Sequence, residues 1–474
     1  NISVVTFAPD CRLNEIGKSA FKNCKITEIE LPASVAKLGS KPFEGCSIAR
    51  LVVPDSLASD GFTDLVAGIS GLKSIECRST CKNFTTIDGA LFSKDGTELV
   101  FCPADKVAEV YTVPAEVRKI GDYSFKDNVG VKSVVFADAD KDLEIGQYAF
   151  QNSSIESVTL PDRLVSIALY AFSGCASLKT VTFGDSCKLS TIGDRAFEKC
   201  ASLTEISLPD LTTSIGAYAF AECSSLKNVN FSENSQLINI GQNAFRSCAA
   251  LVEFTAPKTL VNLGKPSTTD TVLVTTSSYT FYNCKSLKKA DLSSCAVENI
   301  AMYTFESCDA LETVLLPQGL KGIGQYAFRN CVKLSEISLP EGLVTLNAQA
   351  FSGCGQYFEK TGLKTGLKSI TVPSTVTTIG KSVFENCAAL EEATVKSTNV
   401  GENMFLGCVS LKKVTIGAET ESIKALAFSG CKSLAEVNMQ SNVLAEIGKG
   451  AFQNTAITQF TVPDTCLLYT SDAA

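Results

Sequence analysis

The sequence predicts an α/β repeat solenoid, in which short strands and short helical turns stack coil upon coil along 474 residues. Two observations predict this fold class. A phenylalanine anchor recurs sixteen times, mostly at intervals of 21–25 residues, and the spacing of apolar residues changes halfway through each unit. A fixed period of this length indicates stacked repeats. The anchors are Phe21, Phe43, Phe125, Phe150, Phe172, Phe197, Phe220, Phe245, Phe281, Phe305, Phe328, Phe351, Phe384, Phe405, Phe428 and Phe452.

The unit at residues 323–346 shows the order of its parts. Its first half predicts one face of a short helical turn, because its apolar residues are spaced mostly by three or four. These residues are Ile323, Ala327, Phe328, Cys331 and Leu334. Ile337 and Leu339 then alternate like a short strand, and Pro340 ends it because proline cannot donate a ladder hydrogen bond. Gly324 fits a tight corner that needs an unusual backbone conformation.

A single unit cannot bury its own apolar stripe, whereas stacked units share a continuous core, so one parallel sheet is expected. The motifs I-G-x-x-A-F-x-x-C and L-P resemble the BspA-like, or Treponema-type, leucine-rich repeats over residues 2–465, with an interruption between Pro54 and Pro114. The resemblance implies a right-handed leucine-rich-repeat horseshoe with its strands on the concave side. It also implies adhesion or protein binding at a cell surface, without catalytic residues.

The spacing of the anchors divides the chain into four parts. Repeats occupy residues 1–54, with the first unit truncated, and residues 115–465, with insertions near 266–278 and 355–366. Residues 55–114 form an irregular module, in which Lys94-Asp-Gly96 between two apolar runs predicts a hairpin. The insertions are expected to loop out, either as functional loops or as tolerated length variation.

Both ends of the chain interrupt the pattern. The chain begins with Asn1 in the middle of a unit, which predicts that a parent protein extends upstream. Residues 466–474 fit no repeat and are either a sequencing-adapter artefact or a natural irregular terminus.

Thirteen of the 20 cysteines share one slot, three residues after the anchor. Other units place Asn128, Ser153 or Thr455 there, which favours a buried position where free cysteine acts as a small hydrophobe. A disulfide between adjacent coils stays the alternative, since a coil spacing of about 4.8 Å falls within the range for such bonds. The slot cysteines are Cys24, Cys46, Cys175, Cys200, Cys223, Cys248, Cys284, Cys308, Cys331, Cys354, Cys387, Cys408 and Cys431.

Cys77, Cys81 and Cys102 lie together in the irregular module and leave three alternatives open. They could be free, could form a disulfide, or could contribute to a metal site. A zinc site would lack a fourth obvious ligand, because the chain contains no histidine.

The composition excludes several functional classes. Without histidine, a serine-type triad and histidine acid–base catalysis are impossible within this chain. The net charge of −8 gives no basic footprint for nucleic acid. No apolar run reaches the roughly 18 residues of a membrane span. We therefore expect no catalytic residue, no metal and no cofactor.

Two surface stripes are candidates for partner binding. Strand residues that flank the inward valine point outward and are mostly polar, which suits either a binding face or simple solubility. Seven of the 11 tyrosines lie two residues before an anchor, where they form either a contact ladder or half-buried packing. The candidate residues are Tyr148, Tyr170, Tyr218, Thr159, Thr182, Glu205, Asn228 and Asn230.

The sequence thus predicts a non-enzymatic protein-binding or adhesion array of a cell-surface or secreted protein. Its expected partner is a protein or a host or cell-surface glycoprotein, and the chain is expected to be a monomer. The alternative is a scaffold segment whose catalytic or anchoring domain lies outside these residues. An intracellular interaction scaffold is a third, weaker hypothesis.

Overall fold

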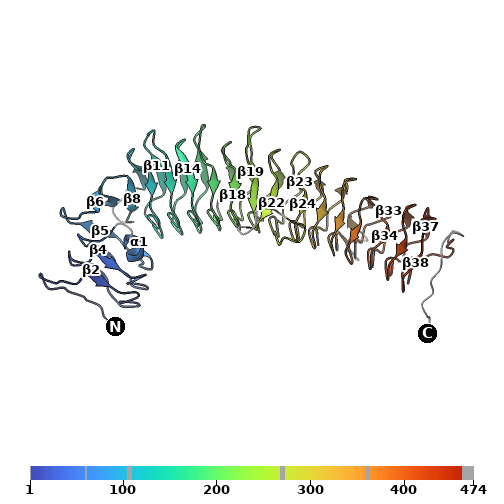
Figure 1. Cartoon of the computed structure of the whole chain (residues 1–474), viewed down its shortest axis with the longest axis horizontal. Helices are drawn as coiled ribbons and strands as arrows, with labels where there is room; N and C mark the ends of the chain where they lie inside the picture. Colours follow the sequence, from blue (N-terminus) through green and yellow to red (C-terminus); the bar gives the residue numbers. More distant parts are fainter. Residues whose placement is uncertain (1, 59–60, 104–108, 267–272, 359–362, 462–474) are drawn as a thin grey trace. The chain divides into compact units, whose positions relative to one another are not determined.

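The chain forms two compact units, Asn1–Thr212 and Thr213–Ala474. The computed structural model describes residues 2–58, 61–103, 109–266, 273–358 and 363–461. Within each unit the chain winds into successive coils whose strands run parallel to those of the next coil (Figure 1). The predicted solenoid of stacked repeats is therefore confirmed.

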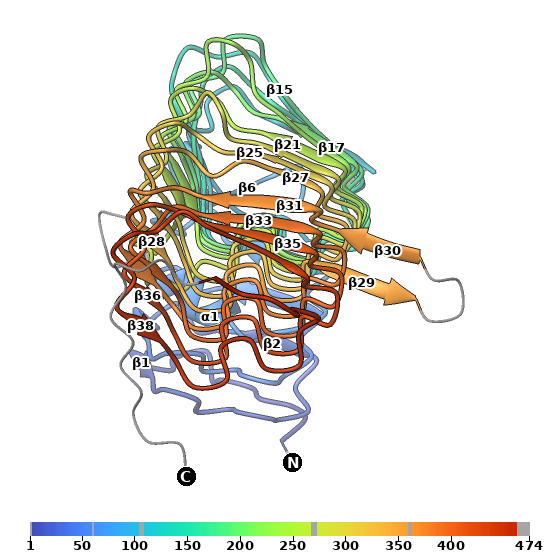
Figure 2. The ribbon, with the colours of Figure 1, turned by 90° about the vertical axis from the view of Figure 1, so that its right-hand side faces the viewer.

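Each coil carries two short strands, one in each of two parallel series. In the first unit, β13 (Ser157–Leu160) pairs with β11 (Ser133–Phe136) and β15 (Thr180–Phe183). Farther along the same coil, β14 (Leu164–Ile167) pairs with β12 (Leu143–Ile145) and β16 (Thr191–Ile192). The prediction of one sheet is therefore wrong, because the segment around the I-G motif is itself a strand. The two series lie on different sides of the coil (Figure 2).

The remaining strands of the first unit follow the same two series. The first series adds β2 (Glu28–Glu30), β4 (Arg50–Val53), β5 (Ser74–Cys77), β9 (Val110–Val113) and β17 (Glu205–Ser207). The second series adds β1 (Glu15–Ile16), β3 (Lys37–Leu38) and β10 (Lys119–Ile120).

The second unit repeats this arrangement. Its first series contains β19 (Asn228–Asn230), β21 (Glu253–Thr255), β23 (Lys289–Asp291), β25 (Thr313–Leu315), β27 (Glu336–Ile337), β31 (Ser369–Val372), β33 (Glu392–Val395), β35 (Lys413–Ile416) and β37 (Glu436–Met439). Its second series contains β18 (Ser214–Ile215), β20 (Asn239–Gly241), β22 (Asn262–Lys265), β24 (Asn299–Ile300), β26 (Gly322–Ile323), β28 (Thr345–Leu346), β32 (Thr378–Ile379), β34 (Asn399–Val400), β36 (Ser422–Ile423) and β38 (Glu446–Ile447).

The anchor segment forms a tight turn where the sequence predicted a helical turn. In all sixteen units the residues two before and two after the anchor have positive φ, as at Tyr326 (60°) and Asn330 (62°). A left-handed residue cannot continue a right-handed helix, which explains why the helical expectation fails. Neighbouring turns join through backbone hydrogen bonds, for example from Phe328 N to Ala350 O at 2.8 Å. The turns thus make a third ladder, and the described part of the chain has one helix, α1 (Gly61–Val66).

The glycine of the I-G motif serves close packing between coils. Gly324 and Gly380 do not have positive φ, so the predicted unusual backbone conformation is absent there. A Cβ on Gly380 would lie 2.1 Å from Ala348 N, and one on Gly324 would lie 2.5 Å from Val274 O. Only a residue without a side chain lets these backbones approach.

The core is a column of phenylalanine rings with a column of thiols beside it. Phe305 and Phe328 stack with ring centroids 5.3 Å apart, and Phe328 and Phe351 follow at 5.0 Å. The Cys331 thiol donates to Phe305 O of the preceding coil at 3.1 Å, and ten other slot cysteines make the equivalent bond. The thirteen slot cysteines are free thiols, and all except the half-buried Cys24 are buried. The prediction of free thiols is confirmed, and its burial part holds for twelve of the thirteen.

The irregular module contains the predicted hairpin. β7 (Ala90–Ser93) pairs antiparallel with β8 (Glu98–Phe101) across the Asp95-Gly96 turn. A second turn at Asp88-Gly89, with φ of 47° and 80°, adds β6 (Phe84–Ile87). β8 then pairs in parallel with β10, which returns the chain to the repeat pattern. The module's Cys77, Cys81 and Cys102 are free thiols in this structure.

The two insertions behave differently. Residues 355–366 were expected as an irregular loop, but β29 (Gly355–Phe358) and β30 (Leu363–Gly366) pair antiparallel and extend away from the coils (Figure 2). Their ordered pairing reflects the opposed backbones of Gly355 and Gly366 at the base. Of the insertion at 266–278, residues 267–272 lie outside the described residues. Its last part lies along the next coil, where Met302 N donates to Thr276 O at 2.8 Å. The predicted tail at 466–474 also lies outside the described residues.

Candidate functional site

The predicted strand-face residues are all exposed. Thr159 on β13 and Thr182 on β15 are direct neighbours in the parallel register, and Glu205 lies on β17 of the same unit. In the second unit, Asn228 and Asn230 lie at the two ends of β19. The alternation of exposed and buried residues along these short strands places the polar side chains outward, as the sequence predicted.

Asn228 and Asn230 also line a surface hollow. Its volume is about 610 Å³, and its wall includes Glu253, Thr255 and Lys258. The wall is polar and carries charges of both signs. It offers hydrogen bonds to a partner without a concentrated charge.

The predicted tyrosines Tyr148 and Tyr170 belong to a ladder of stacked rings in the first unit. Tyr123 and Tyr148 have ring centroids 4.9 Å apart, and Tyr148 and Tyr170 repeat this distance, with interplanar angles of 4° and 10°. All three side chains are half-buried. Burial raises the pKa of Tyr123, so its hydroxyl stays protonated at neutral pH. The rings therefore pack against one another and still present an edge to solvent.

An arginine closes this ladder. The Arg195 guanidinium lies over the Tyr170 ring, 5.6 Å from its centroid. Arg195 Nη1 also pairs with Glu198 Oε1 at 2.8 Å, and the Glu198 residue is only 8% exposed. The buried carboxylate holds the guanidinium over the ring and neutralises it.

The second unit contains a similar ladder, whose tyrosines are not among the candidate residues predicted from the sequence. Tyr279 and Tyr303 have centroids 4.4 Å apart, and Tyr303 and Tyr326 follow at 5.1 Å. The Arg329 guanidinium lies 4.2 Å from the Tyr326 centroid. Arg329 also pairs with the buried Glu306, with Nε 2.7 Å from Oε1. A run of three tyrosine slots next to an Arg and a Glu was the sequence signal that could have found it.

Two further aromatic contacts enlarge the second ladder. Tyr282 meets Tyr279 edge to face at 5.6 Å, and the Arg246 guanidinium lies 5.3 Å from the Tyr282 centroid. Burial and the neighbouring Tyr303 hydroxyl raise the pKa of Tyr279. The predicted Tyr218 is half-buried, and the next slot in its unit holds Asn243 in place of a tyrosine.

The tyrosine slot has a conformational cost. Tyr148 has a φ of 55° and Tyr303 a φ of 63°, a region in which a residue with a Cβ costs roughly 1–2 kcal/mol. Stacking of aromatic rings returns roughly 0.5–1.5 kcal/mol for each pair. The conformational cost falls on any residue with a Cβ in this slot, including Lys41, Asn243 and Ser382, so the stacking gain is what distinguishes tyrosine from them.

The structure does not bring the two predicted stripes together. The tyrosines lie on the turn ladder that follows the second strand series, whereas Thr159, Thr182 and Asn230 lie on the first strand series. One composite site made of all the predicted residues is therefore not formed. They belong to separate surfaces of the coil.

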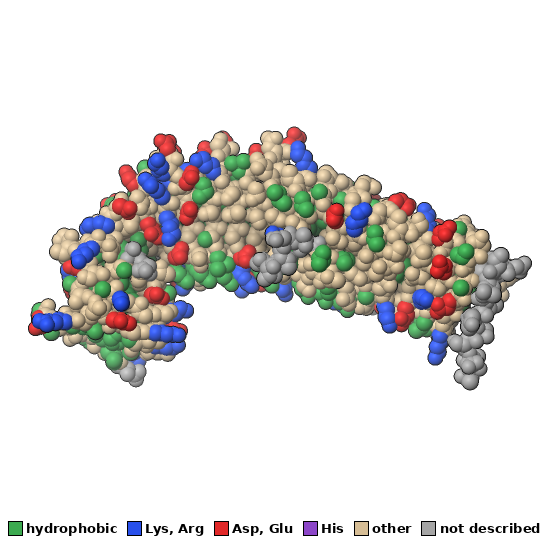
Figure 3. Space-filling view, in the orientation of Figure 1, with side chains coloured by type: hydrophobic (Ala, Val, Ile, Leu, Met, Phe, Trp, Pro, Cys, Tyr) green, Lys and Arg blue, Asp and Glu red, His purple; other side chains and the backbone are tan. Residues whose placement is uncertain are grey.

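Several charged side chains on the surface form ion pairs between coils. Figure 3 shows acidic and basic residues mixed over the face in view. Lys179 pairs with Glu156 of the preceding coil at 2.7 Å, and Lys412 pairs with Glu391 at 2.6 Å. Exposed pairs of this kind contribute little to stability. They leave no large field of one sign there to attract a nucleic acid or a membrane.

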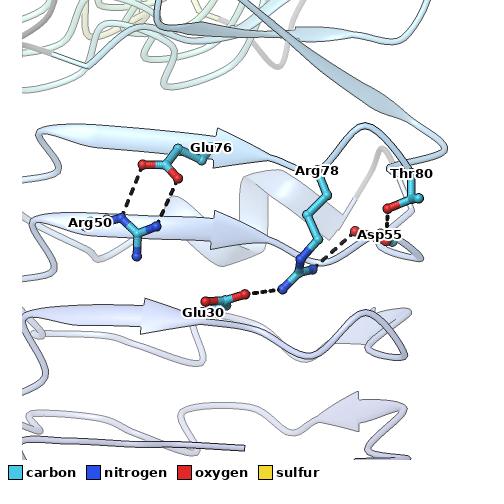
Figure 4. A network of polar contacts seen from close by, with 6 residues as sticks. All are labelled: Glu30, Arg50, Asp55, Glu76, Arg78 and Thr80. Atoms are coloured by element: carbon cyan, nitrogen blue, oxygen red, sulfur yellow. Dashed lines mark hydrogen bonds and ion pairs between the residues drawn. The ribbon is translucent and has the colours of Figure 1, made fainter. Parts of the chain in front are cut away.

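A network of polar contacts lies on β4, β5 and the segments beside them (Figure 4). Arg50 donates to the two carboxylate oxygens of Glu76, from Nε at 3.2 Å and from Nη2 at 2.9 Å. Arg78 bridges Glu30 and Asp55, and Thr80 donates to the same Asp55. Each of these groups has a partner within the chain. We therefore interpret the network as a structural link between coils.

The described residues show no grouping typical of a metal site. Within them, no set of three or more Cys, Asp or Glu side chains is arranged to hold a metal ion. No helix among them is long and apolar enough to cross a membrane.

Comparison with known proteins places the chain in a family. The profile of the BspA type leucine rich repeat region matches residues 1–128, 143–271, 267–358 and 361–473. A leucine-rich repeat protein from Bacteroides ovatus is 29% identical, with a TM-score of 0.50 over 63% of this chain and 72% of its own. A search of curated protein sequences finds no match.

Two other solved structures are similar at lower identity. The pneumococcal vaccine antigen PcpA is 23% identical over 77% of this chain and 96% of its own, with a TM-score of 0.39. A leucine rich cell surface protein from Faecalibacterium prausnitzii is 20% identical over 76% of this chain and 95% of its own, with a TM-score of 0.37. The family profile covers nearly the whole sequence, and this chain therefore belongs to the BspA-type leucine-rich repeat family.

Proposed function

We propose that this chain is a non-enzymatic, partner-binding repeat array of a cell-surface or secreted protein, and that it acts as a monomer. The observation that carries the proposal is the repeated display of the same outward positions on consecutive coils. Thr159 and Thr182 are neighbours on one series, and Tyr148 and Tyr170 are neighbours on the turn ladder. A surface that repeats in this way suits a large ligand that contacts several coils.

Family membership supports the same proposal. Members of the BspA-type family are typically binding proteins without catalytic activity, and this chain has no histidine to support acid–base chemistry. A protein, or a glycoprotein of a host or cell surface, fits a face of hydroxyls, amides and mixed charges. Such a face makes many modest contacts, because β13, β15, β17 and β19, which carry the candidate residues, contain no tyrosine or arginine.

The proposal is tested by measuring binding of the whole chain to a panel of purified, immobilised cell-surface glycoproteins by biolayer interferometry. Saturable binding to at least one member, retained after enzymatic removal of its glycans, is the expected result. Failure to bind any member would contradict the proposal.

Three variants then locate the binding surface. Thr159→Lys with Thr182→Lys changes the strand face, Tyr148→Asn with Tyr170→Asn changes the turn ladder, and deletion of residues 356–365 removes the projecting hairpin. Asn occupies the tyrosine slot naturally at Asn243, so the second variant should fold. Gly355 and Gly366 already face each other, so the deletion joins adjacent backbones. Loss of binding in the deletion alone would shift the site from the stacked surface to the hairpin.

A further inference from the structure

We infer that the chain carries two equivalent protein-docking platforms, one in each unit, and that each takes an acceptor-rich loop of a protein partner. This inference rests on the proposed binding function. Platform 1 consists of Tyr123, Tyr148, Tyr170, Arg195 and Glu198. Platform 2 consists of Tyr279, Tyr303, Tyr326, Arg329 and Glu306.

The two platforms have a similar arrangement of rings and guanidinium, but the arginine and its carboxylate partner come from different positions in the repeat. In platform 1 the arginine occupies the tyrosine slot of the coil after Tyr170, and its carboxylate partner belongs to that same coil. In platform 2 the arginine directly follows the anchor of the Tyr326 coil, and its carboxylate partner comes from the preceding coil. Simple copying of a repeat would have kept the arginine at one position. The shared result, three stacked rings closed by a neutralised guanidinium, is therefore the feature to explain.

The exposed parts of a platform define the chemistry of its partner. The ring faces between Tyr123, Tyr148 and Tyr170 are covered by the stacked neighbours, and the guanidinium lies over Tyr170 at the end of the run. What remains toward solvent is the ring edge, which is electropositive, together with the phenolic hydroxyl. Edges and hydroxyls attract carbonyl and carboxylate oxygens. Ligands that need an open aromatic face, such as a sugar ring or a quaternary ammonium group, gain little from the rings inside the stack.

The composition of a platform is that of an interface hot spot. Tyrosine and arginine are the residues that most often contribute the energy of protein interfaces, and half-buried rings lose little freedom on binding. Each arginine is already paired with a carboxylate that is 8% exposed in Glu198 and 4% exposed in Glu306. A bare anion therefore gains little from it, and shape with hydrogen bonding decides the partner.

The test uses peptides as the probe, so it does not depend on the natural partner. A displayed library of random 12-residue peptides is selected on the immobilised whole chain, and the winners are synthesised and measured by isothermal titration calorimetry. We expect two peptides per chain. Tyr303→Asn and Tyr148→Asn should each remove one site, with binding at that site at least tenfold weaker, and the double variant should remove both. Ser382→Asn, in the same slot outside both platforms, is the matched control and should keep two sites.

Several results would overturn the inference. These are a library that yields no binding peptide, one site per chain, or unchanged binding in the double variant. Binding of neutral oligosaccharides that the same tyrosine variants abolish would assign the platforms to glycans instead. Loss of peptide binding in the double variant while a panel glycoprotein still binds would leave the proposed function intact. It would also show that the glycoprotein binds the chain elsewhere.

Discussion

Gly380→Ala tests the close approach between coils that the repeat requires. The new Cβ would lie 2.1 Å from Ala348 N and 2.7 Å from Ala348 Cα. Both atoms belong to the backbone of the preceding coil, so no flexible side-chain end can move aside. Gly380 N donates to Leu346 O at 2.7 Å, and Ala348 O accepts from Tyr326 N at 3.2 Å. Relief of the clash would lengthen at least one of these bonds.

The expected loss is about 2–3 kcal/mol of unfolding free energy, the upper part of the range of about 1–3 kcal/mol for adding a methyl group to a filled site. Ala168 and Ala301 occupy the equivalent place in their own coils, so a coil can be built around a side chain there. A larger loss is therefore not expected.

Two glycines in the same unit are matched controls. Gly430 has a φ of 75° but no neighbouring atom nearer than 3.7 Å to its Cβ position, so Gly430→Ala should cost about 1 kcal/mol through φ alone. Gly319 has an ordinary φ and nothing within 4 Å, so Gly319→Ala should gain roughly 0.4–1 kcal/mol by restricting the unfolded chain. Urea unfolding, followed by circular dichroism and tyrosine fluorescence, measures all three. A loss in Gly380→Ala no larger than that in Gly430→Ala would refute the close-approach argument.

Three further predictions concern the buried thiols and ion pairs. The buried slot cysteines should resist an aromatic disulfide reagent at pH 8 in the native chain and react fully in urea, whereas rapid labelling of the native chain would contradict their burial. The free energy of unfolding should fall as the pH rises above about 9. Burial raises the pKa of slot thiols, to about 12 for Cys175. The unfolded chain therefore loses these protons at a lower pH than the folded chain. Each such thiol should contribute about 1.4 kcal/mol per pH unit in that window and nothing below it, and a flat urea midpoint between pH 8 and 11 would be inconsistent with this. Glu306→Gln should cost about 1–3 kcal/mol because Arg329 loses a buried partner, while Glu391→Gln at the exposed Lys412 pair should cost less than about 0.5 kcal/mol in the same urea assay.

Sequence patterns were sufficient for the features that repeat identically in every coil. The anchor spacing predicted the solenoid, and the substitution of Cys by Asn or Ser in one slot predicted a buried thiol. Both positions face the shared core, where the same packing constraint acts sixteen times. The second strand series was missed because pieces such as Gly322–Ile323 are two residues long, too short for an alternating pattern. The prediction of a helical turn is wrong because an apolar spacing of three or four carries no information about the two left-handed residues around each anchor.

The candidate site was less predictable because it depends on which residues meet between coils. Counting tyrosines found Tyr148 and Tyr170 but joined them to Tyr218, whose next slot in its own unit is Asn243. The insertion before Tyr279 lengthens its interval, yet the Tyr279 ring still stacks on Tyr303 with centroids 4.4 Å apart. Arg195 and Arg329 hold different positions in the repeat, yet each places its guanidinium over a tyrosine ring. Contacts of this kind depend on the length and direction of each side chain, which cannot be predicted from its position in the repeat.

The division between constant and variable positions explains how such a chain can acquire a binding site. Each coil contacts only its neighbours, so a change at one exposed slot alters the stability of one or two interfaces. The backbone of the turn ladder is held by hydrogen bonds such as Phe405 N to Ala427 O at 2.8 Å, whatever side chain occupies the slot. The slot therefore accepts Tyr303, Asn403 and Leu426 with nearly the same φ, between 55° and 63°. A platform arises when three consecutive slots hold tyrosine, and its specificity depends on the run of slots and on the arginine that closes it.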